Sequence, residues 1–66
     1  MVEKKTAELF LNKYIRIERE DAFKRLFFSF GLLVNVTDRD MILIFRKNPQ
    51  AYDLASVKAI RGAENV

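Results

Sequence analysis

Cysteine and histidine are both absent from this sequence of 66 residues. Without cysteine the chain has no disulfide and no thiolate ligand, and without histidine it lacks the other common ligand of zinc. The usual nucleophile–base pairs of enzymes also depend on one of these two residue types. We therefore expect no disulfide framework, no metal or other cofactor, and no catalytic residues.

Glycine and proline are scarce, with two glycines and one proline in the whole chain. A phosphate-binding loop needs a glycine-rich segment, so none is expected. Asp38 and Asp40 are spaced like the first ligands of a calcium loop, but Ile42 occupies the position of the third oxygen ligand. The sequence therefore predicts a protein that binds a partner and is not an enzyme.

The length of the chain leaves room for one domain, which we expect to span residues 1–66. Half of the residues are hydrophobic and six are phenylalanine, as is typical of a chain that folds. A domain this small usually needs a disulfide, a metal or another chain for stability. No apolar segment follows the charged start of the chain, and the longest uncharged run, residues 26–37, is too short to span a bilayer. We expect a cytoplasmic protein that does not contact a membrane.

Apolar residues near the start of the chain recur at helical spacing, which predicts a first helix over about residues 4–17. A longer helix would bring Glu18 to the centre of the apolar stripe, so the helix should end before that residue. Residues 14–18 also alternate between apolar and polar, which leaves a short strand open as the alternative. The stripe consists of Ala7, Phe10, Leu11, Tyr14 and Ile15.

The phenylalanine-rich segment that follows predicts a second helix over residues 22–30. Asp21 is a suitable N-cap, and Gly31 is a suitable residue to end the helix. Four apolar residues again share one helical face, namely Phe23, Leu26, Phe27 and Phe30.

A β-hairpin is predicted over residues 32–46. Residues 32–36 and 41–46 are mainly aliphatic or β-branched, and the polar residues 37–40 between them favour a turn. The turn has no glycine, so we expect a loop of about three to five residues and not a tight two-residue turn.

A third helix, over residues 49–61, is predicted after the hairpin. Asn48 is a suitable N-cap, Pro49 is favoured at the first helical position, and Gly62 follows the last. The expected fold class is therefore α+β, with the element order α-α-β-β-α and an antiparallel hairpin packed against helices.

The mildly basic composition, with a net charge of +3 and a pI near 9.5, permits contact with DNA or RNA. Basic side chains on the expected first helix lie off its apolar stripe, and others lie in the hairpin loop and at the hairpin's end. This arrangement suits phosphate contacts, although the alternative is that a solvated surface simply carries charge. The candidate nucleic-acid-binding residues are Lys5, Lys13, Arg16, Arg19, Arg39, Arg46 and Lys47.

The expected element order resembles that of a reduced winged helix, with residues 38–40 in the wing. The resemblance implies that the second helix would enter the major groove of DNA. That helix offers only Lys24, Arg25 and Phe28 to a groove, whereas recognition helices carry more polar side chains. Sequence-specific readout through it is therefore not expected.

The second strand of the hairpin is apolar on both faces, because Met41, Leu43 and Phe45 alternate with two isoleucines. Such a strand usually has cover on both faces. A second copy of the chain would provide it, by extending the sheet edge to edge or by laying a helix across the open face. The alternative is that the three helices cover both faces within one chain. The expected dimer-interface residues are Ile42, Ile44 and Leu33.

These features together predict a small homodimeric regulatory protein that contacts nucleic acid through basic residues. The alternative is a protein–protein interaction module, such as an assembly subunit or an inhibitor of a larger machine, that contacts no nucleic acid. Salt-sensitive binding to DNA or RNA distinguishes the first from the second.

Overall fold

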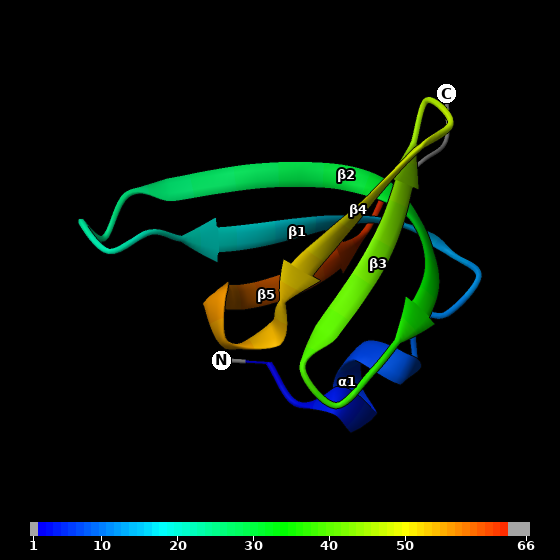
Figure 1. Cartoon of the computed structure of the whole chain (residues 1–66), viewed down its shortest axis with the longest axis horizontal. Coiled ribbons are helices and arrows are strands. Elements are labelled where there is room, and N and C mark those ends of the chain that lie inside the picture. The colour runs from blue at the N-terminus through cyan, green and yellow to red at the C-terminus, as the bar shows by residue number, and fades with distance from the viewer. Residues whose placement is uncertain (1, 64–66) are drawn as a thin grey trace.

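In residues 2–63, which the computed structural model describes, one short helix precedes a five-stranded antiparallel sheet (Figure 1). The elements are α1 (Lys4–Glu8), β1 (Tyr14–Glu20), β2 (Leu26–Val36), β3 (Asp40–Phe45), β4 (Asn48–Asp53), the 3-10 turn η1 (Leu54–Ser56) and β5 (Val57–Gly62). The strand order in the sheet is β4-β3-β2-β1-β5, so β4 and β5 are its edges. No helix in this range is long and apolar enough to cross a membrane.

Strand β2 is the longest element, with 11 residues, and it is shared between two partners. It pairs with β1 from Leu26 to Leu32, and with β3 only from Leu32 onward. Figure 1 shows β2 curving strongly between these two halves. Gly31 lies at the changeover, where an added Cβ would come within 2.9 Å of the carbonyl oxygen of Ile44. A side chain at this position would therefore obstruct the close approach of β3.

The core lies on one face of the curved sheet, which we call the inner face. Residues that point to the inner face alternate along each strand with residues that point away from it. Ile15 and Ile17 are fully buried on the inner face, while Arg16 between them is not buried. Helix α1 contributes Ala7 to the same core. The buried residues are Ala7, Ile15, Ile17, Leu33, Val36, Met41, Leu43, Leu54 and Val57.

The predicted order α-α-β-β-α is wrong, because the fold is mostly β. The first helix ends at Glu8 and not near residue 17, and a left-handed residue, Asn12, lies in the connection to β1. The alternative of a strand over residues 14–18 is confirmed, within the longer β1. The alternation of apolar and charged residues in this segment therefore outweighed its helical spacing.

The predicted second helix, residues 22–30, is also wrong, because residues 26–30 begin strand β2. Its phenylalanines have helical spacing, but Phe28 is apolar as well and would interrupt the polar face that Lys24, Arg25 and Ser29 form on such a helix. Aromatic residues favour strands, and this segment continues directly into the aliphatic second half of β2. Gly31 consequently lies inside a strand and does not end a helix.

The predicted hairpin over residues 32–46 is confirmed, with residues 37–39 as its loop. The helix predicted over residues 49–61 is wrong, because this segment contains β4, η1 and most of β5. Arg46 and Lys47 both have positive φ, at 51° and 68°, and form a tight turn that makes Asn48 the first residue of β4. Asn48 is therefore not a helix cap, and Pro49 lies in an edge strand, where proline is tolerated.

Candidate functional site

A groove of about 370 Å³ lies between β2 and the β3–β4 hairpin, and we call it the aromatic groove. Strand β4 provides one side, because Asn48, Gln50 and Tyr52 alternate and pair with β3 residues of the inner face. Such a volume is within the lower range of small-molecule sites. The groove is lined by Phe28, Ser29, Phe30, Phe45, Asn48, Gln50 and Tyr52.

The groove exists because β2 and β3 separate. Strand β3 pairs with β2 only as far as Ile44 and ends at Phe45, so residues 26–30 of β2 have no strand partner on that side within the described part of the chain. The β1–β2 hairpin extends away from β3 and β4 in this region (Figure 1). The lining residues 28–30 lie along this unpaired edge of β2.

Arg19 joins the two sides of the groove from β1. It lies opposite the core residue Val57, so it is on the inner face. Its Nε donates a hydrogen bond to Oγ of Ser29 over 3.3 Å, and its guanidinium lies 4.7 Å from the centre of the Tyr52 ring. This distance is within the range of a cation–π interaction. Arg19 therefore holds two lining residues that belong to different strands.

Two other arginines, in the β1–β2 hairpin, lie over aromatic rings but are also paired with carboxylates. Arg16 lies 5.3 Å from the centre of the Phe28 ring, and its Nη2 lies 3.6 Å from Oε1 of Glu18. Arg25 lies over Phe23 and forms an ion pair with Asp21. Within residues 2–63, by contrast, no ion pair engages Arg19, Arg46 or Lys47.

The structure brings together three of the seven predicted nucleic-acid-binding residues. Arg19 contacts two lining residues, and the turn that contains Arg46 and Lys47 connects two others, Phe45 and Asn48. The remaining four lie elsewhere: Lys5 on α1, Lys13 before β1, Arg16 on the outer face of β1 and Arg39 in the loop at the opposite end of β3.

The helical basic stripe that motivated this prediction does not exist. Helix α1 ends before Lys13, and Arg16 and Arg19 lie three residues apart on a strand, where successive positions face opposite ways. The resemblance to a winged helix is also wrong, because most of the segment that was expected to form the recognition helix belongs to the first half of strand β2.

The three predicted interface residues divide between the two faces of the sheet. Leu33 is fully buried in the core of the chain, so it is not available to a partner. Ile42 and Ile44 lie on the outer face, where they are half-buried.

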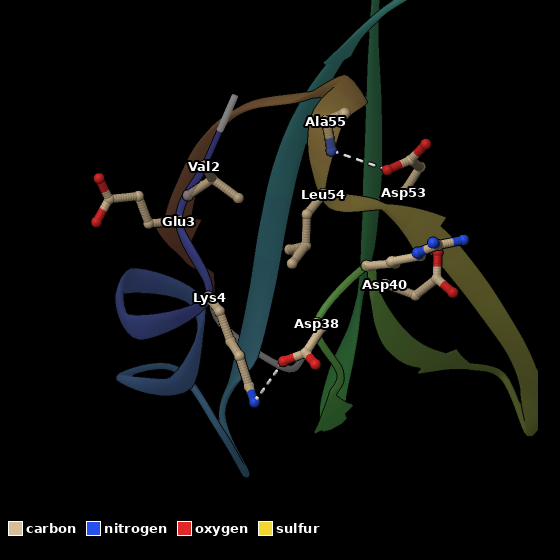
Figure 2. Close-up of a pocket in the computed structure, with 9 residues that line it drawn as sticks. Val2, Glu3, Lys4, Asp38, Asp40, Asp53, Leu54 and Ala55 are labelled. Atoms are coloured by element: carbon tan, nitrogen blue, oxygen red, sulfur yellow. Dashed lines mark hydrogen bonds and ion pairs between the residues drawn. The ribbon is translucent and has the colours of Figure 1, made fainter.

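A larger cavity, of about 600 Å³, lies where α1 meets the β2–β3 loop and η1 (Figure 2). Three of its charged side chains have partners within the chain: Nζ of Lys4 donates to Asp38 over 3.0 Å, and Asp53 accepts from the backbone N–H of Ala55 over 2.9 Å. The hydrogen bond to Asp38 raises the pKa of Lys4. Among residues 2–63 no group of carboxylates is arranged to hold a metal ion. We therefore regard this cavity as a structural junction.

The lining residues of the aromatic groove could not be identified while their segments were assigned to helices. Asn48 was expected to cap a helix, and Gln50 and Tyr52 to lie on one. The sequence does contain a signal for these residues, because Asn48, Gln50 and Tyr52 occupy every second position. A strand places residues with this spacing on one face. Comparison of the chain with protein-family models, with curated proteins and with solved structures found no match.

Chemically, the aromatic groove offers aromatic rings, two side-chain amides and the hydroxyls of Ser29 and Tyr52, and the cations beside it form no ion pair within residues 2–63. Rings and guanidinium planes stack on flat π systems, and amides bind groups that present a donor and an acceptor side by side. The arrangement suits a planar, polar and negatively charged ligand.

Proposed function

We propose that this chain is a non-enzymatic protein that binds single-stranded nucleic acid in the aromatic groove. The observation that carries the proposal is the position of Arg19, which lies over the Tyr52 ring beside the groove and has no carboxylate partner among the described residues 2–63. Bases stack on such rings, and the neighbouring turn carries two cations, Arg46 and Lys47, which would contact phosphates.

Single strands fit this site better than duplexes. The π faces of bases are accessible to aromatic side chains only where the bases are unstacked. The described residues also contain no helix that would enter a major groove, since α1 has five residues and its Ala7 is buried in the core.

Fluorescence anisotropy with labelled DNA and RNA of about ten nucleotides, single-stranded and duplex, tests the proposal. We expect micromolar binding to single strands that weakens as salt rises from about 50 to 200 mM. If the three cations each neutralise one phosphate, the slope of log K against log salt is about −2. Tighter binding to the duplex, or no binding at the lower salt, would contradict the proposal.

A second candidate function is self-association through the outer face of the sheet. This face carries an apolar surface around Leu32, which pairs with Ile44, and an exposed surface of this kind is typical of an interface. The edge strands β4 and β5 also each have one unpaired side within the described chain. The apolar residues of this outer face are Phe28, Phe30, Leu32, Val34, Ile42 and Ile44.

Sedimentation equilibrium tests self-association. We expect the wild type to exceed the monomer mass of 7.8 kDa and Ile44→Lys to return to it. Ala55→Lys, which adds the same charge in the exposed part of η1, should behave like the wild type. A wild type that stays monomeric at high micromolar concentration would contradict self-association. If it also binds no nucleic acid, a larger protein is the remaining partner.

A further inference from the structure

We infer that the nucleic-acid site continues beyond the aromatic groove along the β1–β2 hairpin, and that the ring of Phe23 at the hairpin tip stacks on a further base. This extension rests on the proposed function, because it continues the path of the single strand that the groove receives. It follows from a row of side chains in which aromatic rings and guanidiniums alternate, which we call the hairpin row. The members of the hairpin row, in order from the groove, are Tyr52, Arg19, Phe27, Arg25 and Phe23.

Each member of the hairpin row lies beside the next. The guanidinium of Arg19 lies 4.7 Å from the centre of the Tyr52 ring, and Arg19 pairs directly with Phe27 across the two strands. The guanidinium of Arg25 lies 6.0 Å from the centre of the Phe27 ring and 5.4 Å from that of Phe23. These distances suit cation–π contacts, and cross-strand partners have neighbouring side chains. The row therefore leads from the groove to the hairpin tip.

The outer part of the hairpin row is open to solvent. Phe27 is 43% exposed and Phe23 is 79% exposed. Figure 1 shows the β1–β2 hairpin extending away from β3 and β4 in this region. A group of exposed aromatic rings is typical of a binding surface.

Hydrogen bonds at the tip fix the backbone that carries Phe23. Oδ1 of Asp21 accepts from the backbone N–H groups of Phe23 and Arg25, and the backbone N–H of Asp21 donates to the carbonyl oxygen of Arg25 over 3.0 Å. Lys24 has a positive φ of 62° within this turn. A ring that an ordered turn presents loses less conformational freedom on binding than a ring on a flexible loop.

A single strand of nucleic acid is the occupant that suits the hairpin row. Proteins that bind single strands stack successive bases on aromatic side chains, and arginines add cation–π contacts. The charge of Arg25 is paired with Asp21, so the cation for a phosphate at the tip is Lys24, which forms no ion pair within residues 2–63. A lipid surface suits the row less well, because guanidiniums between the rings are costly to place in hydrocarbon.

Fluorescence anisotropy with labelled uracil oligomers of about four and about twelve nucleotides tests this extension. The short oligomer fills the groove, and the long one also reaches the tip. We expect Phe23→Ala to weaken binding of the long oligomer by about tenfold, as the loss of one stacked base predicts, and to change binding of the short one by less than about twofold. Phe23→Tyr retains a ring and should bind both oligomers like the wild type.

Leu26→Ala is the matched control, because it removes another exposed apolar side chain from the same hairpin. Leu26 is 54% exposed and points to the face opposite that of its neighbour Phe27. The control should bind both oligomers like the wild type. Circular dichroism melting of the three variants verifies that they fold.

The outcomes separate this extension from the proposed function. If the wild type binds both oligomers and Phe23→Ala binds the long one equally well, the extension is overturned and the proposed function stands. Equal losses in Phe23→Ala and Leu26→Ala also overturn the extension, because general apolar contact at the tip would then contribute the affinity. Binding of neither oligomer by the wild type overturns the extension and the proposed function together.

A vesicle arm identifies the other occupant of an exposed aromatic tip. The wild type should not sediment with vesicles of anionic phospholipid. Sedimentation that Phe23→Ala abolishes would assign the tip to a lipid surface and overturn the extension.

Discussion

The guanidinium of Arg19 lies 4.7 Å from the centre of the Tyr52 ring, although β1 and β4 are separated in the sheet by β2 and β3. The contact is possible because the sheet is curved, so that the inner faces of its first and fourth strands approach each other. It links a cation to an aromatic ring at the side of the aromatic groove, and its two residues can be changed separately.

Replacing Tyr52 with leucine should weaken binding to single-stranded oligonucleotides by about 1–3 kcal/mol, the contribution of one stacked base. Leucine keeps an apolar side chain against the core residues that Tyr52 contacts, so the loss should come from stacking. Tyr52→Phe retains the ring and should bind like the wild type. Anisotropy titrations of both variants measure the effect, and equal losses in the two would show that the hydroxyl, not the ring, contributes the affinity.

Replacing Arg19 with methionine should weaken binding and make the salt dependence shallower by about 0.7 in the slope of log K against log salt, as expected for one lost phosphate contact on a single strand. Methionine keeps the apolar part of the side chain on the inner face. Arg39→Met is the control, because Arg39 is exposed at the opposite end of β3 and should leave the slope unchanged. If both variants change the slope equally, the nucleic acid does not select the aromatic groove.

The β2–β3 hairpin could be predicted from the sequence because its signals are local. Val34 and Val36 precede a polar loop, and Met41–Phe45 follows it, so alternation and turn chemistry agree. Two of the misassigned segments, residues 22–30 and 49–61, each satisfy a helical pattern as well as a strand pattern. What decides between the patterns is pairing with distant strands, such as that of β1 with β5, which a local window does not contain.

The candidate site was predicted only in part for a related reason. Arg19, Arg46 and Lys47 could be selected by charge alone, whatever the secondary structure. Gln50 and Tyr52 can be recognised as site residues only when β4 is known to be a strand. The strand places both side chains on the inner face, where they line the groove. Arg46 and Lys47 form a tight turn without the glycine that usually marks one, so the start of β4 was not apparent.

Gly31 should be the less tolerant of the two glycines. An alanine Cβ there would lie 2.9 Å from the carbonyl oxygen of Ile44 and 3.0 Å from Cβ of Leu43, so β2 and β3 would have to separate. We expect Gly31→Ala to lower the free energy of unfolding by about 1–3 kcal/mol. Gly62→Ala is the matched control, because a Cβ at Gly62 meets nothing within 4 Å, and its effect should stay within about 0.5 kcal/mol. Urea unfolding of both variants decides the comparison, and equal stability of the two would contradict the close approach.

The carboxylate of Asp21 holds the turn between β1 and β2, and it should make the stability of the protein depend on acid pH. Its oxygens accept hydrogen bonds from the backbone N–H groups of Arg25 and Phe23, over 2.9 and 2.8 Å, and from Nε of Arg25 over 3.0 Å. These bonds, above all the one from the Arg25 backbone, hold the pKa of Asp21 below its ordinary value of 3.8. Hydrogen bonds to a carboxylate favour its charged form, which is the form that the turn binds.

The direction of the pH effect follows from this pKa. Because the pKa of Asp21 is lower in the folded state than in the unfolded chain, the stabilisation is fully present above the unfolded value of about 4. It is lost as the pH falls through the folded pKa. Asp21→Asn keeps an acceptor oxygen but removes the charge, so we expect it to be less stable than the wild type at neutral pH, with a difference that shrinks below about pH 4. Urea unfolding of both proteins at a series of pH values from neutral to strongly acidic measures this difference. A difference that stays constant over the whole series would show that the charge of Asp21 does not hold the turn.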